Sequence, residues 1–372
     1  MTFIPLSAPS ITEADIDAVS HVLRSGMVVQ GENVAALEKA VGEYLGIRNV
    51  VAVSNGTASL HLALVAFGIG AGDEVIVPAF SFVATANVVE LVGARSVFVD
   101  IEQDTFNIDM SKIEAAITPH TKAIIPVHEF GLACDISAIV EIARKHELLV
   151  IEDAACALGA REDGRFAGTF GNVGSFSLHP RKAVTSGEGG LLTTNDDALA
   201  EKFRILRNHG IRHRDGRTEY AAAGFNYRMT DFQAALVRGQ FERLDDIVNR
   251  RNELASVYLE KLSPAKNLML PAVPRQKNHT WQTFHTLISD DVDRDMLIAK
   301  LKQRGIGSNY GAQCIPDQEY YRNKYSLDSA SLYPNALRSN KHGLALPLYD
   351  KMETAQAEFV CMTLLSLLAE DL

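Results

Sequence analysis

The sequence predicts an α/β protein built on a large, mostly parallel sheet, with a smaller α+β unit toward its C-terminal end. From about residue 48 to 195, short apolar runs alternate with stretches of helical periodicity. The strand-like runs are apolar on both faces, which is typical of parallel strands covered by helices on both sides. After the proline-containing stretch "SPAKNLMLPAVPRQ" the pattern changes. We therefore expect two structural units rather than one.

The expected elements of the large sheet follow one another along the chain. The strand "NVVAVS" is followed by the helix "ASLHLALVAFG", and "EVIVPAF" is followed by "SFVATANVVELVG". The strands "RSVFVDI", "KAIIPVHEF", "LLVIEDAA", "GSFSLHPRK" and "GGLLTTND" come next, with the helix "DISAIVEIARKH" among them. The pattern "DDALAEKFRILRNHG" predicts a helix that ends at Gly210. Ligands of such sheets bind beyond the carboxyl ends of the strands, so residues after each apolar run are candidates for a site.

The C-terminal third has a different organisation. Apolar residues recur at helical spacing from Thr230 to about Leu262, which predicts a long helix that links two domains. The strand "TWQTFHTLIS" and the helices "RDMLIAKLKQRG" and "TAQAEFVCMTLLSLLAEDL" predict a small α+β domain. We expect three parts: an N-terminal segment that packs near the small domain (residues 1–25), a large domain that carries the parallel sheet (26–245), and a linker helix with the small C-terminal domain (246–372).

Composition excludes several functional classes. The 372 residues carry a formal net charge of −10, which argues against a nucleic-acid partner. No apolar run approaches the roughly 20 residues of a membrane span. The first residues lack a secretory pattern, and the four cysteines are widely spaced without a CxxC motif. These features predict a reduced, cytoplasmic protein without a membrane partner. His209 and His213 lack an HExxH context and a third ligand nearby, so no metal site is expected.

The stretch "VSNGTASLHLAL" predicts a strand that turns directly into a helix. The turn contains Gly56 and Thr57, and Ala58 follows inside the first helical turn. Free backbone N–H groups and the helix dipole make such a terminus an anion site. The alternative is an ordinary capped helix, for which Ser and Thr are standard residues.

The stretch "LLVIEDAACALGA" places Glu152 and Asp153 at the expected end of a strand. Burial of a carboxylate there is costly unless it pairs with a cation. A protonated pyridine nitrogen would be a suitable partner, and the small residues Ala154 and Ala155 would leave room for a flat ring. The alternative is a helix N-cap aspartate.

The stretch "SLHPRKAVTSGEGG" places Lys182 between a proline-containing corner and a glycine-rich hairpin. A lysine that forms a Schiff base needs partial burial and fixed placement, whereas a solvated lysine needs neither. Together these stretches offer an anion-binding helix start, a strand-end carboxylate and a positioned lysine. These are the three contacts that pyridoxal 5′-phosphate (PLP) needs from a protein. Phe82, in "VPAFSF", could stack on the ring of that cofactor.

These motifs carry a family resemblance that spans nearly the whole chain. The chain resembles the DegT/DnrJ/StrS group of PLP-dependent sugar aminotransferases of fold type I, in "SNGTASLHLAL", "GDEVIVPAFSFVATAN", "VIEDAACALGA", "SFSLHPRK" and "GFNYRMTDFQAAL". The resemblance implies that Lys182 forms the Schiff base, that Asp153 pairs with the pyridine nitrogen, and that Phe82 stacks on the ring. It also implies that the phosphate is held by the turn at Gly56, Thr57 and Ala58 together with Ser177.

Asn226, in "GFNYR", matches a family position that reaches the phosphate from the partner subunit. A homodimer with shared active sites is therefore expected. Cys156 departs from the pattern, because the family often has Gln, Glu or His at this position, beside the 3-oxygen of the cofactor. A thiol is a weak hydrogen-bond partner. Related 3-dehydratases have His in place of the lysine, so Lys182 favours transamination.

The resemblance implies transfer of an amino group from L-glutamate to a keto-sugar, most often a nucleotide-linked keto-deoxyhexose used for cell-surface polysaccharides or secondary metabolites. The "GIGSNYGAQCIPD" stretch lacks an expected histidine, which leaves a free keto-sugar acid or keto-cyclitol as the alternative acceptor. A PLP lyase is a further alternative, while a non-catalytic regulator would lose the lysine or the aspartate. Arg212 and its basic neighbours could meet an anionic substrate or form a solvated loop. Candidate substrate contacts are Gln30, His179, Arg181, Glu188 and Tyr310.

Overall fold

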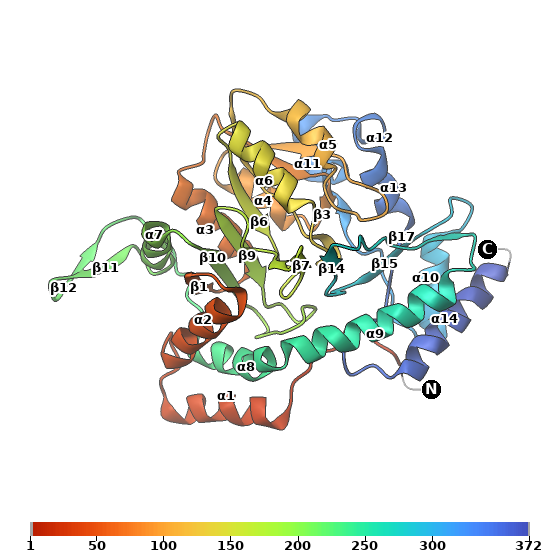
Figure 1. The fold of residues 1–372 in the computed structure, drawn as a ribbon, viewed down its shortest axis with the longest axis horizontal. Coiled ribbons are helices and arrows are strands. Elements are labelled where there is room, and N and C mark those ends of the chain that lie inside the picture. The colour runs from red at the N-terminus through yellow and green to blue at the C-terminus, as the bar shows by residue number, and fades with distance from the viewer. Residues whose placement is uncertain (1–2, 371–372) are drawn as a thin grey trace.

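A seven-stranded sheet forms the centre of the computed structural model, which describes residues 3–370 (Figure 1). β10 runs antiparallel to both of its neighbours, and the other pairs are parallel, so the predicted mostly parallel α/β sheet is confirmed. In spatial order the strands are β1 (Asn49–Val53), β10 (Gly190–Thr194), β9 (Val173–Ser177), β6 (Leu149–Asp153), β5 (Thr121–Ile124), β2 (Glu74–Pro78) and β4 (Arg95–Val99).

Helices cover both faces of this sheet, because successive residues of a strand point to opposite sides. Val51, Val75 and Ile151 face one layer, formed by α3 (Gly56–Phe67), α4 (Ala84–Leu91) and α7 (Asp197–Arg207). Val50 and Val150 face the opposite layer, formed by α2 (Glu32–Leu45), α6 (Ile136–Lys145) and α8 (Asp231–Glu242). Both layers contain large clusters of buried apolar side chains, which explains why the strand sequences are mostly apolar.

The C-terminal part contains a second, antiparallel sheet. A hydrophobic core lies between this sheet and three helices, on the right of Figure 1. The elements are β13 (Leu268–Met269), β15 (Phe284–Ile288), β17 (Gly343–Leu346), α9 (Leu244–Leu262), α10 (Arg294–Gln303) and α14 (Thr354–Ala369). The N-terminal segment touches this part through a bridge between Ile4 and Ile306, whereas α1 (Glu13–Ser25) packs against α8.

Residues 313–342 return to the large sheet, although the sequence places them with the small domain. Tyr321 donates a hydrogen bond to Asn87 at 2.6 Å, and the Ala336 N–H donates to Asp100 at 3.0 Å. The segment comprises β16 (Gln313–Cys314), α11 (Glu319–Tyr325), α12 (Ser329–Leu332) and α13 (Pro334–His342). β16 pairs with β3 (Phe80–Ser81) and thereby joins the two parts of the chain.

The predicted linker helix is two helices in the structure. α8 ends at Glu242 and α9 begins at Leu244, and Arg243 between them has φ −103° and ψ 11°. The Arg243 guanidinium donates to the Asp15 carboxylate of α1 at 2.8 Å. Apolar periodicity continues across the break, which is why the sequence alone predicts one helix.

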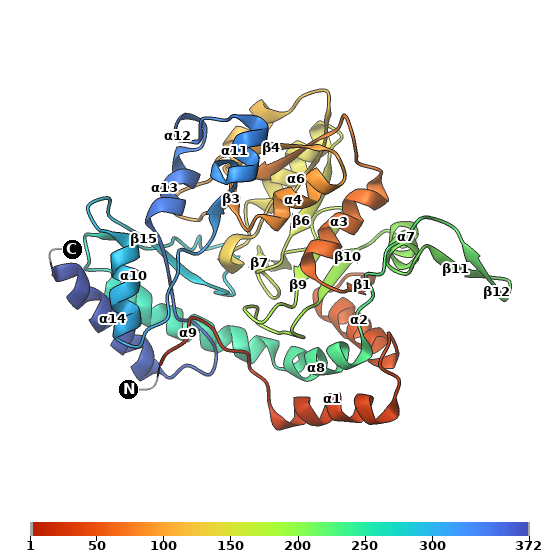
Figure 2. The same cartoon turned by 180° about the vertical axis from the view of Figure 1, so that it is seen from behind.

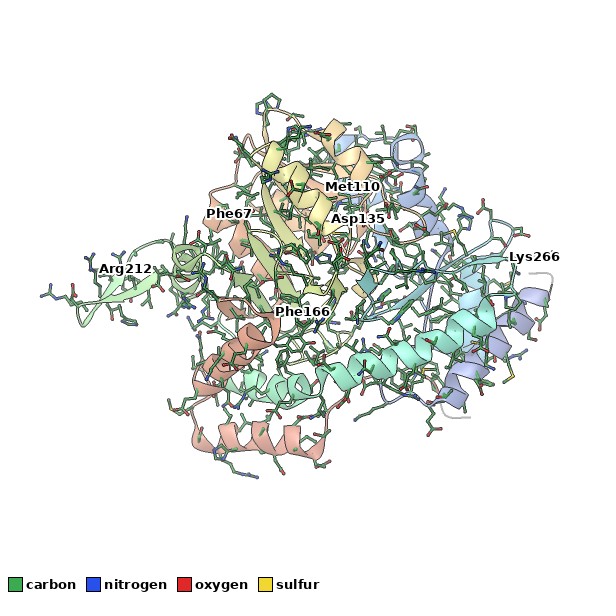
Figure 3. The ribbon with its side chains drawn as sticks, viewed as in Figure 1. Phe67, Met110, Asp135, Phe166, Arg212 and Lys266 are labelled. Atoms are coloured by element: carbon green, nitrogen blue, oxygen red, sulfur yellow. The ribbon has the colours of Figure 1, made fainter. Side chains whose placement is uncertain are left out.

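A hairpin of β11 (Ile211–Arg214) and β12 (Arg217–Tyr220) protrudes from the molecule beyond α7 (Figures 1 and 2). Figure 3 shows Arg212 on this hairpin, well away from the sheets. The hairpin was not expected, because its strands are polar and have no apolar face. The short elements that remain are α5 (Met110–Ile113), β7 (Arg161–Glu162), β8 (Arg165–Phe166) and β14 (Lys277–Asn278).

Candidate active site

The start of α3 forms a tight turn against the end of β9. Asn55 is the N-cap of the helix, and its side-chain oxygen accepts a hydrogen bond from the Ala58 N–H at 2.7 Å. Gly56 is buried, and a Cβ atom at this position would lie 2.9 Å from the Cβ of Ser177. The turn therefore needs glycine, and Thr57 remains exposed beside it. The structure thus brings together Gly56, Thr57, Ala58 and Ser177, while the Ala58 N–H is engaged by Asn55.

The two acids at the end of β6 have different surroundings. The Glu152 carboxylate accepts hydrogen bonds from the Gly168 N–H at 2.7 Å and from the Phe170 and Gly171 N–H groups at 2.6 Å each. His128 lies 3.0 Å from it, and the His128 Nδ1 accepts from the Cys134 N–H, which places the ring proton on the nitrogen facing Glu152. Glu152 is therefore a structural acid that holds the 168–171 turn.

Asp153 faces the opposite side and has fewer partners. Its carboxylate accepts hydrogen bonds from the Thr85 hydroxyl at 2.8 Å and from the Ala155 N–H at 3.2 Å. Burial raises the pKa of Asp153, and Thr85, Ala155 and the nearby Lys182 act in the opposite direction. A carboxylate held in this way has a strong electrostatic preference for a cation beside it.

Lys182 lies in the connection between β9 and β10. The backbone of this connection is fixed because the Leu178 N–H donates to the Gly189 carbonyl at 2.8 Å, and the Thr185 hydroxyl donates to the Leu178 carbonyl at 2.7 Å. The Lys182 N–H itself donates to the His179 carbonyl at 2.8 Å. These bonds hold the backbone on both sides of Lys182 in place.

The side chain of Lys182 reaches back toward β6. Its Nζ atom donates a hydrogen bond to the Cys156 sulfur at 3.0 Å. Burial raises the pKa of the Cys156 thiol, with Lys182 opposing the shift. β6 and β9 are parallel neighbours that pair Asp153 with Ser175, and Lys182 lies close enough to Asp153 to act against the rise of its pKa. We refer to the region around the Asp153, Cys156 and Lys182 side chains as the cleft.

The other predicted contacts lie around this cleft or on separate segments. Phe82, between β3 and α4, is 65% exposed, and Asn226 is exposed where it bridges to Asn208 below the hairpin. His179 and Arg181 flank Lys182, and Glu188 follows on the turn before β10, where its carbonyl accepts from Gln233. Gln30 lies between α1 and α2, and Tyr310 lies between α10 and β16.

Two polar residues of the cleft are missing from the sequence-based prediction. Thr85 is the hydroxyl partner of Asp153, and Glu129 is a buried acid just after β5. An acid that ends the apolar run "KAIIPVHEF" is a weak signal for Glu129, while Thr85 gives no signal in the sequence. Among residues 3–370, no group of three potential metal ligands is found, and no helix is long and apolar enough to cross a membrane.

The chain is similar to known proteins in sequence and in structure. The profile of the DegT/DnrJ/EryC1/StrS aminotransferase family matches residues 9–365. An uncharacterized protein of Methanocaldococcus jannaschii is 37% identical over 364 residues, which cover 94% of each chain.

Three solved structures illustrate the structural likeness. A Streptococcus pneumoniae protein assigned as a sugar aminotransferase, in its PLP form, has a TM-score of 0.94 at 29% identity and covers 100% of both chains. S. venezuelae DesV, in complex with a ketimine intermediate, has a TM-score of 0.91 at 32% identity over 99% of each chain. Helicobacter pylori PseC, an aminotransferase of pseudoaminic acid biosynthesis, has a TM-score of 0.93 at 26% identity and covers 99% of this chain and 100% of its own.

Proposed function

The chain belongs to the DegT/DnrJ/EryC1/StrS aminotransferase family, and from this we propose that it is a PLP-dependent enzyme that moves an amino group from L-glutamate to a keto-sugar. The solved neighbours support both the cofactor and the substrate class, because they include a PLP form and enzymes of sugar biosynthesis. The observation that carries the proposal is the arrangement of two side chains. The Lys182 amine lies 3.0 Å from the Cys156 sulfur, and it lies close enough to the buried Asp153 carboxylate to act against the rise of its pKa.

The residues present fit PLP. At one end, the turn at Gly56 leaves no room for a Cβ beside Ser177 and presents the start of a helix to an anion. At the other end, Asp153 is a buried carboxylate without a cationic hydrogen-bond partner, as expected for a group that pairs with a pyridine nitrogen. When bound, PLP supplies an electron-withdrawing ring that makes the Cα–H bond of an amino acid acidic.

The chain's own residues would contribute binding and proton transfer. Asp153 would hold a proton on the ring nitrogen, since burial favours its pairing with a cation. Lys182 would bind the cofactor and, once released by the amino donor, its Nζ would carry the proton to and from the reacting carbon. The short backbone bonds of the Lys182 connection keep this amine at a fixed position, which lowers the cost of orienting it. Phe82 would cover the ring, and Ser177 would bind the phosphate.

We infer that the enzyme is a homodimer with shared active sites. Asn226 lies outside the cleft in the single chain, at the base of the protruding hairpin, and would reach the partner's phosphate. Phe82 is 65% exposed, and Met27 and Val29 are 73% and 61% exposed. Large apolar side chains that are this exposed are typical of a surface covered in an assembly.

The acceptor that we propose is a nucleotide-linked keto-deoxyhexose, as used for cell-surface polysaccharides or secondary metabolites. Gln30, His179, Arg181, Glu188 and Tyr310 remain the proposed substrate contacts. The alternative acceptor is a free keto-sugar acid or keto-cyclitol, because the segment around Tyr310 has Cys314 and Pro316 where a histidine is expected.

The test begins with the purified protein and added PLP. We expect an absorbance band near the visible edge that L-glutamate bleaches, and we expect both features to be absent in Lys182→Ala and present in the control Lys39→Ala. A colourless wild-type protein that takes up no PLP would refute the proposal. Incubation of the glutamate-treated protein with nucleotide-linked and free keto-sugars then identifies the acceptor, and release of ammonia without an aminosugar would indicate a lyase instead.

A further inference from the structure

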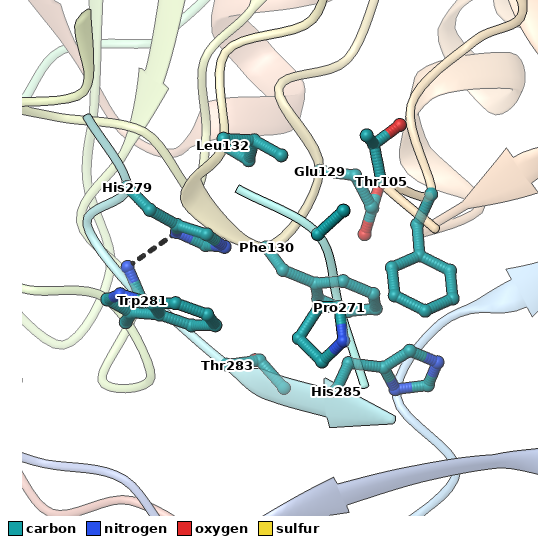
Figure 4. Close-up of a pocket in the computed structure, with 11 residues that line it drawn as sticks. Thr105, Glu129, Phe130, Leu132, Pro271, His279, Trp281, Thr283 and His285 are labelled. Atoms are coloured by element: carbon teal, nitrogen blue, oxygen red, sulfur yellow. Dashed lines mark hydrogen bonds between the residues drawn. The ribbon is translucent and has the colours of Figure 1, made fainter. Parts of the chain in front are cut away.

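Glu129 is a buried acid that the mechanism above does not use. The strand β5 is prolonged by a bridge between Val127 and Asp153, so the chain leaves the sheet beside the end of β6. Glu129 is 4% exposed, and its Oε2 atom is buried without a hydrogen-bond partner. Figure 4 shows Glu129 on the wall of a small pocket between the two sheets. A buried carboxyl oxygen without a partner is costly and requires a functional or structural explanation.

The backbone around Glu129 is held under strain. Phe130 has a φ of 54°, a left-handed conformation that is unfavourable for a bulky residue. The Gln282 N–H donates to the Phe130 carbonyl at 2.9 Å, and the Glu129 N–H donates to the side chain of Asn107 at 2.9 Å. These bonds stabilise a conformation that the chain would otherwise avoid, and the result is a fixed acid at the edge of the cleft.

The same loop lies against the segment that carries Cys156. The Thr280 hydroxyl is within hydrogen-bonding distance of the carbonyls of Gly131 and Cys156, at 3.2 Å in each case. A Cβ at Gly131 would lie 3.1 Å from the Cys156 carbonyl oxygen. Glu129 is therefore placed on the Cys156 side of Lys182.

The charge environment keeps Glu129 in its uncharged form near neutral pH. Burial and the neighbouring Asp153 carboxylate raise the pKa of Glu129 to about 8, while Lys182 and the Ser81 hydroxyl act in the opposite direction. Burial lowers the pKa of each pocket histidine to about 3, so neither is a cationic partner at neutral pH. The titratable groups that surround Glu129 are Asp153, Cys156, Lys182, His279 and His285.

We propose that Glu129 is a further catalytic-site residue, which donates a hydrogen bond from its uncharged carboxyl group to the 3-oxygen of PLP. Family resemblance places that oxygen beside Cys156, whose thiol is too weak a donor to serve it well. Glu129, which follows β5, would provide the hydrogen bond to the 3-oxygen that Cys156 cannot provide well. The inference rests on the proposed function, since it requires that PLP binds beside Lys182.

The first experiment follows the absorbance of the bound cofactor as a function of pH. With PLP bound, the nitrogen of Lys182 would also donate a hydrogen bond to the 3-oxygen, and a second donor to that oxygen would weaken this contact. Loss of the donor should therefore raise the pH at which the absorbance change of the bound cofactor is half complete. We expect a rise of about one pH unit or more in Glu129→Leu, as for loss of one hydrogen bond to a charged oxygen. Glu129→Gln, which keeps an N–H donor, should shift less.

The second experiment uses the cofactor-free protein. Cys156 is the most accessible of the four cysteines, because the other three are buried, so iodoacetamide should alkylate it first. Ionisation of Glu129 changes the charge next to the Cys156–Lys182 contact. The pH profile of the alkylation rate should show an inflection near pH 8 in the wild type. Glu129→Gln should remove this inflection. If Glu129 had only a structural role, the inflection would remain in this variant.

The matched control is Glu102→Gln. Burial also raises the pKa of Glu102, and its carboxylate accepts from the Thr105 hydroxyl at 2.8 Å, but it lies before the β5 strand and away from Lys182. The control should reproduce both wild-type profiles. An unchanged spectral midpoint in Glu129→Leu, or an alkylation inflection that persists in Glu129→Gln, would overturn the inference. If Glu129→Leu does not fold, the alkylation profile of Glu129→Gln carries the test. Failure of the wild type to take up PLP would refute the proposed function instead, and the alkylation profile would still report whether Glu129 titrates in the cleft.

Discussion

Replacement of Thr85 by valine tests how the chain controls Asp153. Thr85 is buried and its hydroxyl donates to Asp153 at 2.8 Å, so Thr85→Val removes one hydrogen bond to a charged group at nearly constant volume. Such bonds contribute about 1.5–3 kcal/mol. At about 1.4 kcal/mol per pKa unit, the pKa of Asp153, already raised by burial, should rise by roughly a further one to two units.

The sign of the effect on stability follows from this raised pKa. A carboxyl whose pKa is higher in the folded state favours folding at low pH, and that contribution is lost as the pH rises through the folded pKa. At neutral pH the cofactor-free Thr85→Val protein should therefore be less stable than the wild type by about 1.5–3 kcal/mol. Urea unfolding of both proteins measures this difference.

The control is Thr286→Val, which removes a partly buried hydrogen bond to the Met269 carbonyl at 2.7 Å within the smaller sheet. A neutral bond of this kind contributes about 0.5–1.5 kcal/mol. The pH profile of the Kd of PLP should shift toward higher pH by roughly one to two units in Thr85→Val, because Asp153 must ionise to pair with the pyridine nitrogen, and it should remain unchanged in Thr286→Val. Equal losses of stability in the two variants, with the same Kd profile, would refute the assigned role of Thr85.

Two further results are expected. Lys182→Ala and Asn226→Ala should each be inactive. When the two proteins are mixed and allowed to exchange subunits, half of the dimers should contain one intact site, so the mixture should recover about a quarter of the wild-type activity. An inactive mixture would contradict shared active sites. The cofactor-free protein should lose stability as the pH rises from about 4.5 to about 8, because folding raises the pKa of Glu129 from the lower to the higher of these values. The free energy of unfolding should fall by at most about 1.4 kcal/mol per pH unit. Urea unfolding of Glu129→Gln should show a flatter profile, and an unchanged slope would mean that Glu129 does not titrate there.

Much of the large sheet could be predicted from the sequence, because its strands are buried on both faces and therefore apolar along their length. The direction of β10 could not, since side-chain alternation is the same in parallel and antiparallel strands. The break at Arg243 was missed because the apolar periodicity of α8 continues into α9, and the Asp15 carboxylate that Arg243 contacts there comes from a distant part of the chain.

The site was predictable to the extent that local sequence determines it. The Gly56 turn and the Lys182 connection each follow a strand directly, and their residue types are unusual enough to indicate a role. Glu129 is different, because its burial depends on residues 279–285, which arrive from a distant part of the chain and close over the loop. Thr85 was likewise inaccessible to prediction, since its contact with Asp153 exists only when α4 and β6 are placed side by side.

The Lys182 connection is also attached to the C-terminal part of the molecule. The Gln282 side chain, just before β15, donates to the Arg181 carbonyl at 3.0 Å, and the buried Arg251 of α9 donates to the Lys182 carbonyl at 3.4 Å. The backbone that carries the amine is thus tethered to elements of the smaller sheet as well as to its own strands. The position of Lys182 therefore depends on how the smaller sheet sits, and a substitution at Gln282 or Arg251 would act on the backbone of Lys182 without touching its amine.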